Sequence, residues 1–240
     1  MVTEYPRLEK RTLVEDFITR FEEMILSGQL SIGEKLPSER ELAQKLGVSR
    51  PVVHDGLINL AEKGLITRNP SGGSIVNDYR REGSLAMLNS LLNFREGTLE
   101  PRLSESTMDF RRLFEVESAR LSALNASDQP VEELKKKLEE EENAGLSDLD
   151  SQAALDFQFH HLIAIASGNI LYPLLLNSCR PLYINFATMF YSIPGIRPSV
   201  LQFHRDLIDA IAARDPEDAQ KIMIQMLEHG TSGYMTSIQP

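Results

Sequence analysis

Apolar residues recur every three or four positions along most of this chain, and that spacing predicts helices. Residues 7–27 carry one such stripe, which ends at Ser27 and Gly28. No strand-like alternation appears after residue 80, and turn signals divide the apolar stripes there. The helices expected in this part span residues 85–94, 108–124, 130–143, 148–167, 169–191, 197–213 and 216–233. We therefore predict an all-helical bundle of six or seven helices.

Residues 36–76 carry the most specific local signals. Ser38 and Glu41 have the spacing of a capping box, which starts a helix, and Gly47 is a typical stop. Ser49 can cap a second helix at once, and Gly64 ends that helix. Two helices separated by a few residues are typical of a helix-turn-helix.

A hairpin is expected directly after the second helix. Residues 65–68 and 74–76 have strand composition, and the turn between them is rich in glycine. A helix-turn-helix followed by a hairpin is a winged helix. The fold class is thus mainly α: an N-terminal winged helix-turn-helix with a small β-hairpin wing, and a C-terminal all-α helical bundle.

The boundary between the two parts is expected where the apolar pattern lapses. Residues 77–84 are polar and show no apolar face. We accordingly predict a winged helix-turn-helix domain over residues 1–78, a linker over 79–84 and a helical effector-binding and dimerisation domain over 85–240.

Three motifs resemble the GntR family of transcriptional regulators. They are the Leu-Pro-Ser-Glu-Arg box at 36–40, the Gly-Val-Ser-Arg turn at 47–50 and the Ser-Gly-Gly wing at 71–73. The chain departs from the family at residues 53–56, where it has Val-His-Asp-Gly and relatives usually have Val-Arg-Glu-Ala. The resemblance implies contacts with DNA by Arg40, Ser49, Arg50, His54, Gly72 and Gly73. The altered segment predicts a different operator preference.

The composition limits the remaining possibilities. The chain has 240 residues, 42% of them hydrophobic, enough for two medium cores. No apolar run approaches a membrane span, and the N-terminus lacks an apolar signal core, so we expect a cytoplasmic protein without membrane contact. The single cysteine, Cys179, excludes a disulfide framework and a cysteine-rich zinc site.

The negative charge is unevenly distributed. The net charge is −10, yet residues 1–80 hold 11 Lys and Arg against 12 Asp and Glu, while residues 81–240 hold 14 against 23. Phosphate contact needs a local basic surface and not a basic protein. The residues that could form that surface are Lys35, Arg40, Lys45, Arg50 and Arg68. Because one such module would bind weakly, we expect a homodimer on double-stranded operator DNA.

Four residues of the helical part could bind a metal ion. Asp156 and His160 lie four apart on one predicted helix, so their side chains can reach one point, and His204 and His229 lie on two others. Carboxylate and imidazole ligands from several helices suit zinc, nickel or manganese. The alternative is an ordinary surface pair of Asp156 and His160.

The same residues resemble the FadR subfamily, in the version whose FCD-type domain holds a divalent metal through one aspartate and three histidines. Asp156, His160 and His204 match the first three positions. The fourth normally falls twenty-two residues after the third and is Met226 here, so the ligand set is incomplete. His229, three residues further on, could substitute or could be a solvated residue.

Effector binding is expected nearby. Arg111 and Glu115 stand where this subfamily has an arginine and a glutamate lining the effector cavity, although four-residue spacing also suits an intrahelical salt bridge. The planar guanidinium of Arg111 would fit a carboxylate on a sugar acid or organic acid. Arg180 and Tyr183 are weaker candidates for the same role.

These features together predict a ligand-responsive transcription regulator, which we interpret as a repressor, although the residues leave the direction of control open. One alternative is an acyl-CoA-type sensor without metal. Another is a metal-dependent hydrolase built on Asp156, His160 and His204. No evident general base accompanies those residues, and a hydrolase would have no use for the winged helix, so we do not expect an enzyme.

Overall fold

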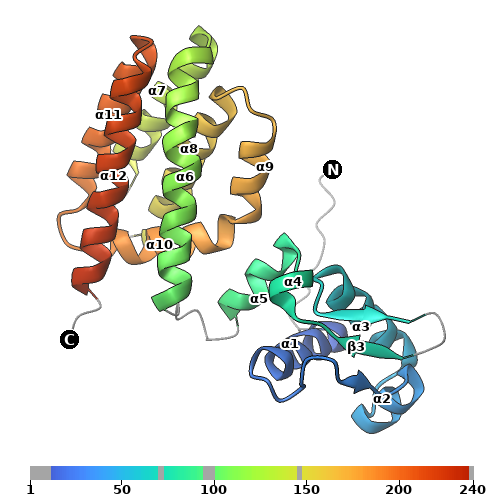
Figure 1. Ribbon diagram of the computed structural model, residues 1–240. Coiled ribbons are helices and arrows are strands. Elements are labelled where there is room, and N and C mark those ends of the chain that lie inside the picture. The colour runs from blue at the N-terminus through green and yellow to red at the C-terminus, as the bar shows by residue number, and fades with distance from the viewer. Residues whose placement is uncertain (1–11, 70–72, 94–100, 145–147, 238–240) are drawn as a thin grey trace, which may run out of the picture. The chain divides into compact units, whose positions relative to one another are not determined.

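A computed structural model describes residues 12–69, 73–93, 101–144 and 148–237 of the chain. The chain divides into two compact units, Met1–Glu96 and Gly97–Pro240, which we describe separately (Figure 1). Within the described residues, no helix has both the length and the apolar character that crossing a membrane requires.

The first unit is a winged helix-turn-helix, as the sequence predicts. Its main elements are α1 (Leu13–Leu26), β1 (Lys35–Leu36), α2 (Glu39–Leu46), α3 (Arg50–Glu62), β2 (Ile66–Arg68) and β3 (Ser74–Val76). The predicted capping box is present: Ser38 Oγ accepts from the Glu41 amide, and Glu41 Oε2 accepts from the Ser38 amide at 2.9 Å. Gly47 ends α2 with a left-handed φ of 67°. Ser49 is the N-cap residue of α3, but its side chain makes no capping hydrogen bond.

The wing contains one strand more than the sequence indicates. The sheet is antiparallel in the order β1-β3-β2, with Leu36 opposite Ser74 and Thr67 opposite Ile75. The predicted hairpin is therefore present, and β1 pairs with its second strand. Two residues are too few to show an alternating pattern, which is why sequence alone misses β1.

The expected linker at residues 79–84 is wrong. Residues Tyr79–Glu82 form α4, and Leu85–Met87 (η1) and Leu88–Asn93 (α5) follow within the first unit. Met87 is buried in the core of that unit, and Ser90 Oγ donates to the buried Glu22 carboxylate at 2.8 Å. These elements pack through a few side chains each, so their sequence looks polar. The short helix expected at 85–94 consequently belongs to the first unit and not to the bundle.

The second unit is the predicted all-helical bundle. Its described helices are α6 (Pro101–Asn125), α7 (Asp128–Asn143), α8 (Leu149–Ala166), α9 (Leu171–Ser178), α10 (Arg180–Tyr191), α11 (Arg197–Ala212) and α12 (Pro216–Ser237). The single helix expected over 169–191 is two helices that meet at Cys179. Pro181 explains the break, because proline lacks the amide hydrogen that a continuous helix would need there and is tolerated in the first turn of a new helix.

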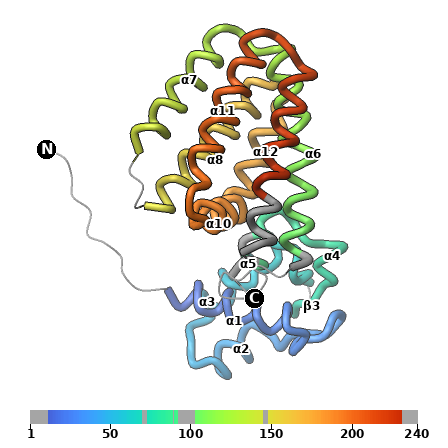
Figure 2. The backbone as a smooth tube through the Cα atoms, turned by 90° about the vertical axis from the view of Figure 1, so that its left-hand side faces the viewer, coloured from blue at the N-terminus to red at the C-terminus, as the bar shows by residue number. Residues whose placement is uncertain are grey.

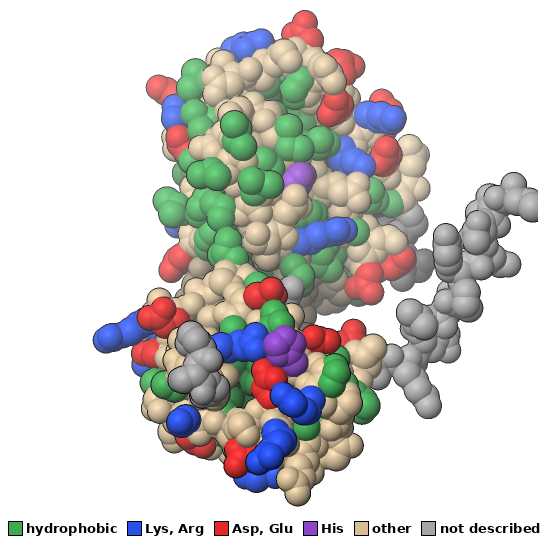
Figure 3. Space-filling view, turned by 90° about the vertical axis from the view of Figure 1, so that its right-hand side faces the viewer, with side chains coloured by type: hydrophobic (Ala, Val, Ile, Leu, Met, Phe, Trp, Pro, Cys, Tyr) green, Lys and Arg blue, Asp and Glu red, His purple; other side chains and the backbone are tan. Residues whose placement is uncertain are grey.

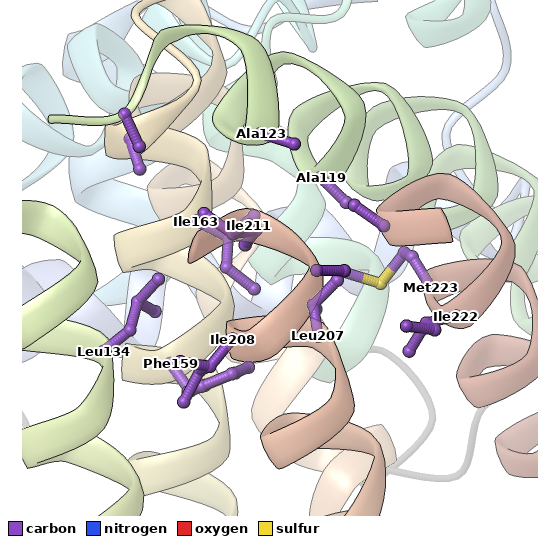
Figure 4. Packing of buried hydrophobic residues seen from close by; sticks show 14 of the residues in the cluster. Ala119, Ala123, Leu134, Phe159, Ile163, Leu207, Ile208, Ile211, Ile222 and Met223 are labelled. Atoms are coloured by element: carbon purple, nitrogen blue, oxygen red, sulfur yellow. The ribbon is translucent and has the colours of Figure 1, made fainter. Parts of the chain in front are cut away.

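The core of the bundle joins five helices. Figure 4 shows Ala119 and Ala123 of α6 facing side chains of α11 and α12, with Phe159 and Ile163 of α8 beside them. Helix α8 has buried residues on several faces, so it is the central helix of the unit. Helix α10 lies across one end of the bundle (Figures 1 and 2). This arrangement directs polar side chains of α6, α7, α8, α10 and α11 toward one interior region.

Gly64 provides a test of how α4 packs on α3. Its φ is +78°, and an added Cβ would lie 1.9 Å from the backbone oxygen of Glu82. Gly47 is a matched control, because its φ of +67° is also left-handed but nothing lies within 4 Å of the added Cβ. We expect Gly47→Ala to lower the free energy of unfolding by about 1 kcal/mol and Gly64→Ala by roughly 2 kcal/mol more. Urea denaturation of the full chain measures both, and equal losses would contradict this packing.

Candidate functional site

A hollow on the first unit brings together three of the predicted DNA-contacting residues. Arg40, Arg50 and Gly73 line it, together with Arg68 from β2. Arg40 and Arg50 are exposed, because α3 turns its apolar residues inward and leaves Arg50 on its outer face. Gly72 lies outside the described residues. The face shown in Figure 3 carries Lys and Arg side chains, interspersed with Asp and Glu, around a histidine on this unit.

His54 belongs to a three-residue cluster beside this hollow. Its Nδ1 lies 3.0 Å from Glu39 Oε1, and Arg68 donates to the same oxygen at 3.0 Å. The hydrogen bond to His54, with the charge of Arg68, lowers the pKa of Glu39. The sequence predicts that His54 contacts DNA, but it gives no sign that the Glu39 carboxylate holds both the His54 ring and the Arg68 guanidinium.

The segment at residues 53–56, which differs from the one usual in the family, contains both surface and core residues. His54 and Asp55 are exposed, whereas Gly56 is buried against α1. A Cβ at Gly56 would lie 2.2 Å from Cδ1 of Phe17, so glycine is needed for close packing of α3 on α1. The alanine usual in relatives would not fit here. An effect on DNA preference is therefore expected from His54 and Asp55, and not from Gly56.

The second unit brings Asp156, His160 and His204 together. Asp156 and His160 come from α8 and His204 from α11, all three are buried, and one possible ligand atom from each lies within 4.8 Å of the others. The four-residue spacing accounts for Asp156 and His160 sharing one face of α8, and the fold brings His204 of α11 beside them. His229 is elsewhere: its Nε2 lies 3.2 Å from Ser199 Oγ, outside this cluster.

A carboxylate lies against the Nδ1 atom of each histidine. Glu115 Oε2 contacts His160 Nδ1, and Glu141 Oε2 lies 2.7 Å from His204 Nδ1. Burial alone would lower the pKa of His204, but Glu141 and the neighbouring carboxylates raise it overall. Nε2 of His204 is buried without a hydrogen-bond partner in the described residues and lies 3.7 Å from Asp156 Oδ1. This donor set fits a divalent ion, since nitrogen and oxygen ligands face one another and the imidazoles have outer carboxylate partners.

Two tyrosines of α10 hold Asp156. Tyr183 donates to Oδ2 at 2.7 Å and Tyr191 to Oδ1 at 3.0 Å. Burial is the main cause that raises the pKa of both phenols well above the ordinary value, and the nearby carboxylates raise it further. Both hydroxyls therefore keep their protons and act as donors. Each carboxylate oxygen has a second lone pair, which leaves Asp156 able to bind an ion.

Arg111 forms the intrahelical salt bridge that its four-residue spacing from Glu115 allows, and it also lies at the interior site. It makes the intrahelical salt bridge, with Nε 2.5 Å from Glu115 Oε1, and it also donates to Tyr183 at 3.0 Å. Burial alone would raise the pKa of Glu115, but Arg111 and then His160 lower it to about 2. The salt bridge is therefore charged and buried, which is a different situation from a solvated surface pair.

A small cavity adjoins these residues. Its volume is about 40 Å³, enough for roughly three water molecules. Arg111, Asp156, His160 and Met226 are among its lining residues. Arg180 is not among them, because its guanidinium lies 5.3 Å from the ring centroid of Phe157. Tyr183 reaches the site through its hydroxyl.

Sequence reasoning missed two residues of this site, Glu141 and Tyr191. Residues 130–143 read as a solvated helix because of their mixed charges. Yet Glu141 continues the apolar face formed by Val131, Leu134 and Leu138, at spacings of three and four residues, and is buried. That position was a usable signal. Tyr191 lies in an aromatic stretch that looks like ordinary core, and nothing in its spacing identifies the partner Asp156.

Comparisons with known proteins agree with both units. Residues 13–76 match the family model for bacterial regulatory proteins of the gntR family, and residues 106–229 match the FCD domain. The HTH-type transcriptional regulator Mce2R of Mycobacterium tuberculosis is 31% identical, with 94% of this chain and 93% of the relative covered. The Glc operon transcriptional activator of Escherichia coli is also 31% identical, with 89% and 85% covered. The solved structure of a Streptococcus agalactiae GntR protein has a TM-score of 0.51 at 26% identity, covering 91% of this chain and 99% of that one.

The buried pair of Arg111 and Glu115 predicts a stability effect. Arg111→Met leaves the Glu115 carboxylate buried without its guanidinium, which should lower the free energy of unfolding by about 3–5 kcal/mol. Arg120→Met is the matched control, because Arg120 pairs with Glu117 on the same helix at a half-exposed position. That change should cost under about 1 kcal/mol. Urea denaturation measures the free energy of unfolding of both variants. Similar losses would show that burial does not make the pair of Arg111 and Glu115 more important for stability than the pair of Arg120 and Glu117.

Proposed function

Because the chain belongs to the GntR family of bacterial regulatory proteins and carries an FCD domain, we propose that a small carboxylate, assisted by a divalent metal ion, controls its binding to operator DNA. The chain is a DNA-binding transcription regulator of GntR and FadR type. The family and the relatives are regulators and not enzymes, as expected for this chain.

We place DNA recognition in the hollow of the first unit. Arg50, at the start of α3, is positioned to read a guanine edge or bind phosphate, and Arg40 to bind phosphate. Ser49 would contact phosphate, His54 a base edge, and the wing around Gly73 the minor groove. The near-neutral charge of residues 1–80 limits the affinity of one copy. Two copies of the chain on two half-sites would supply the rest.

The effector site is proposed in the second unit, where one observation carries the argument. Nε2 of the fully buried His204 has no hydrogen-bond partner in the described residues, yet it faces Asp156 beside a cavity. Asp156, His160 and His204 would hold zinc, nickel or manganese, and a bound ion would supply positive charge for a carboxylate. Arg111 lines the same cavity and adds a fixed cation.

The size of the cavity favours a small acid over an acyl-CoA. A volume of about 40 Å³ has room for a few heavy atoms, whereas an acyl chain would need α6, α10 and α12 to separate. The polar side chains that line the cavity, Arg111, Asp156 and His160, also favour a polar occupant, because an apolar chain would leave their remaining hydrogen-bonding capacity unused. An organic acid of a few carbon atoms fits best, and a sugar acid would require side chains to move.

Arg50 provides the test of the DNA-reading surface. Arg50→Ala should weaken binding to a duplex selected by this protein from a random library by about 10- to 100-fold and reduce the salt dependence by about one charge. Arg80→Ala is the control, because Arg80 is exposed in α4 and pairs with Asp78. Fluorescence anisotropy at several salt concentrations measures both. Unchanged affinity for Arg50→Ala would show that α3 does not read the DNA as proposed.

The metal and effector proposal has its own test. Purified chain, stripped with a chelator, should bind one Zn²⁺, Ni²⁺ or Mn²⁺ ion by calorimetry, and Asp156→Ala should abolish this. His229→Ala should leave binding unchanged, because His229 lies outside the cluster. A thermal-shift screen of small organic and sugar acids should then find stabilisation that is larger with metal present. Absence of binding for all three ions would remove the metal from the proposal.

A further inference from the structure

Glu141 occupies an unusual place in α7. The inward face of this helix consists of Val131, Leu134 and Leu138, and Glu141 holds the next position on that face. The residue is buried, and its Oε1 has no hydrogen-bond partner among the described residues. A carboxylate in a position suited to leucine destabilises a fold unless it makes compensating contacts. The contact that Glu141 makes is with His204.

The orientation of the His204 imidazole is fixed by two groups. Phe159 stacks on the ring at a centroid distance of 3.8 Å and an interplanar angle of 15°, which sets the plane of the imidazole. Glu141 Oε2 lies 2.7 Å from Nδ1, which sets the rotation of the ring within that plane. A neutral imidazole that donates from Nδ1 presents a lone pair at Nε2. That atom faces Asp156.

We propose that Glu141 is a positioning residue for metal binding: it fixes the His204 ring so that the Nε2 lone pair faces Asp156 and His160. This inference rests on the metal site in the proposed function. Glu141 would not bind the same ion, because it contacts Nδ1, on the opposite edge of the imidazole from Nε2. Its role is to orient the histidine and increase its basicity.

The end of α7 is itself held against α11, and the two helices lie side by side (Figure 2). Arg197, at the start of α11, donates to backbone oxygens of Glu141, Glu142 and Ala144. Arg205 of α11 pairs with the Glu142 carboxylate at 2.5 Å. The backbone that carries Glu141 is therefore anchored independently of the contact between Glu141 and His204.

Orientation of His204 matters more in this chain because Met226 stands where the family has a further histidine. With three protein ligands, a rotated imidazole would leave only two groups on the ion. Glu142 offers a matched control one residue away, since its carboxylate is half-exposed and pairs with Arg205. The two glutamates are neighbours at the end of α7, but they differ in burial and in which side chain they contact.

The test is the Zn²⁺ affinity of the full chain, measured by competition with a chromogenic chelator. Glu141→Gln keeps an acceptor for Nδ1 but loses the charge, so the dissociation constant should rise about 10-fold. Glu141→Ala loses both and should show a rise of about 100-fold. Glu142→Gln should stay within about twofold, because half-exposed pairs have little effect. Circular dichroism confirms that each variant is folded, and Glu141→Gln serves if the alanine variant is not.

A second measurement separates positioning from a general structural role. The visible absorption of the Co²⁺-loaded chain reports ligand geometry, and it should change for Glu141→Ala and remain unchanged for Glu142→Gln. If wild-type chain binds Zn²⁺ and the Glu141 variants bind it equally well, the positioning role is overturned and the metal site remains. If Glu142→Gln weakens binding as much, the effect belongs to the end of α7 and the inference fails. If wild-type chain binds no ion, the metal site fails first and the inference with it.

Discussion

The second unit depends on the compensation of buried charge. Glu115, Glu141 and Asp156 are carboxylates in the interior of a helical bundle, where an unpaired charge would cost several kcal/mol. Each finds its partner on a different helix or one turn along its own: Arg111 and His160 for Glu115, His204 for Glu141, and two tyrosines for Asp156. Together, the carboxylates and their partners come from α6, α7, α8, α10 and α11. The requirement that every charge be paired therefore fixes how five helices meet, and it does so at the place where an ion and an acid would bind.

The first unit uses charge in the opposite way. Its proposed DNA-reading surface is exposed, and Glu39 holds His54 and Arg68 through contacts that solvent can screen. Such contacts add little to stability but restrict where the side chains of His54 and Arg68 point. The stability of this unit depends instead on its core, where α3 lies so close to α1 that only glycine fits at position 56. One short segment, residues 53–56, thus combines a requirement of the core at Gly56 with a surface choice at His54. A comparison of sequences alone would treat both as changes in DNA preference.

The sequence predicts structure well where a residue acts on the backbone beside it or on a residue one helical turn away. Ser38, Glu41 and Gly47 specify a helix start and stop through their own backbone geometry, and Asp156 and His160 must share a face because they are four apart. It failed where the decisive partner is distant. Glu141 looked solvated because its neighbours in sequence are charged, and its partner His204 is 63 residues away. The same holds for Ser90 and Glu22, whose contact 68 residues apart places α5 in the first unit. Local patterns predict elements, whereas buried polar contacts between elements require the fold.

Met226 stands where the resemblance implies a fourth, histidine ligand, and this gives the proposed site a consistent character. With Asp156, His160 and His204 as ligands, an ion keeps open positions that an effector carboxylate can occupy, so acid and metal would bind cooperatively. The acid would also meet Arg111, which is tied to α10 through Tyr183. Occupancy would then link α6, α8, α10 and α11 through one small ligand. Such a ligand shifts the protein between states only by binding one arrangement of these helices better than another. The proposed ion ligands lie on α8 and α11, and their orienting contacts come from α6, α7 and α10. Such a site is suited to that discrimination, because a small displacement of one of these helices would change the geometry around the ion.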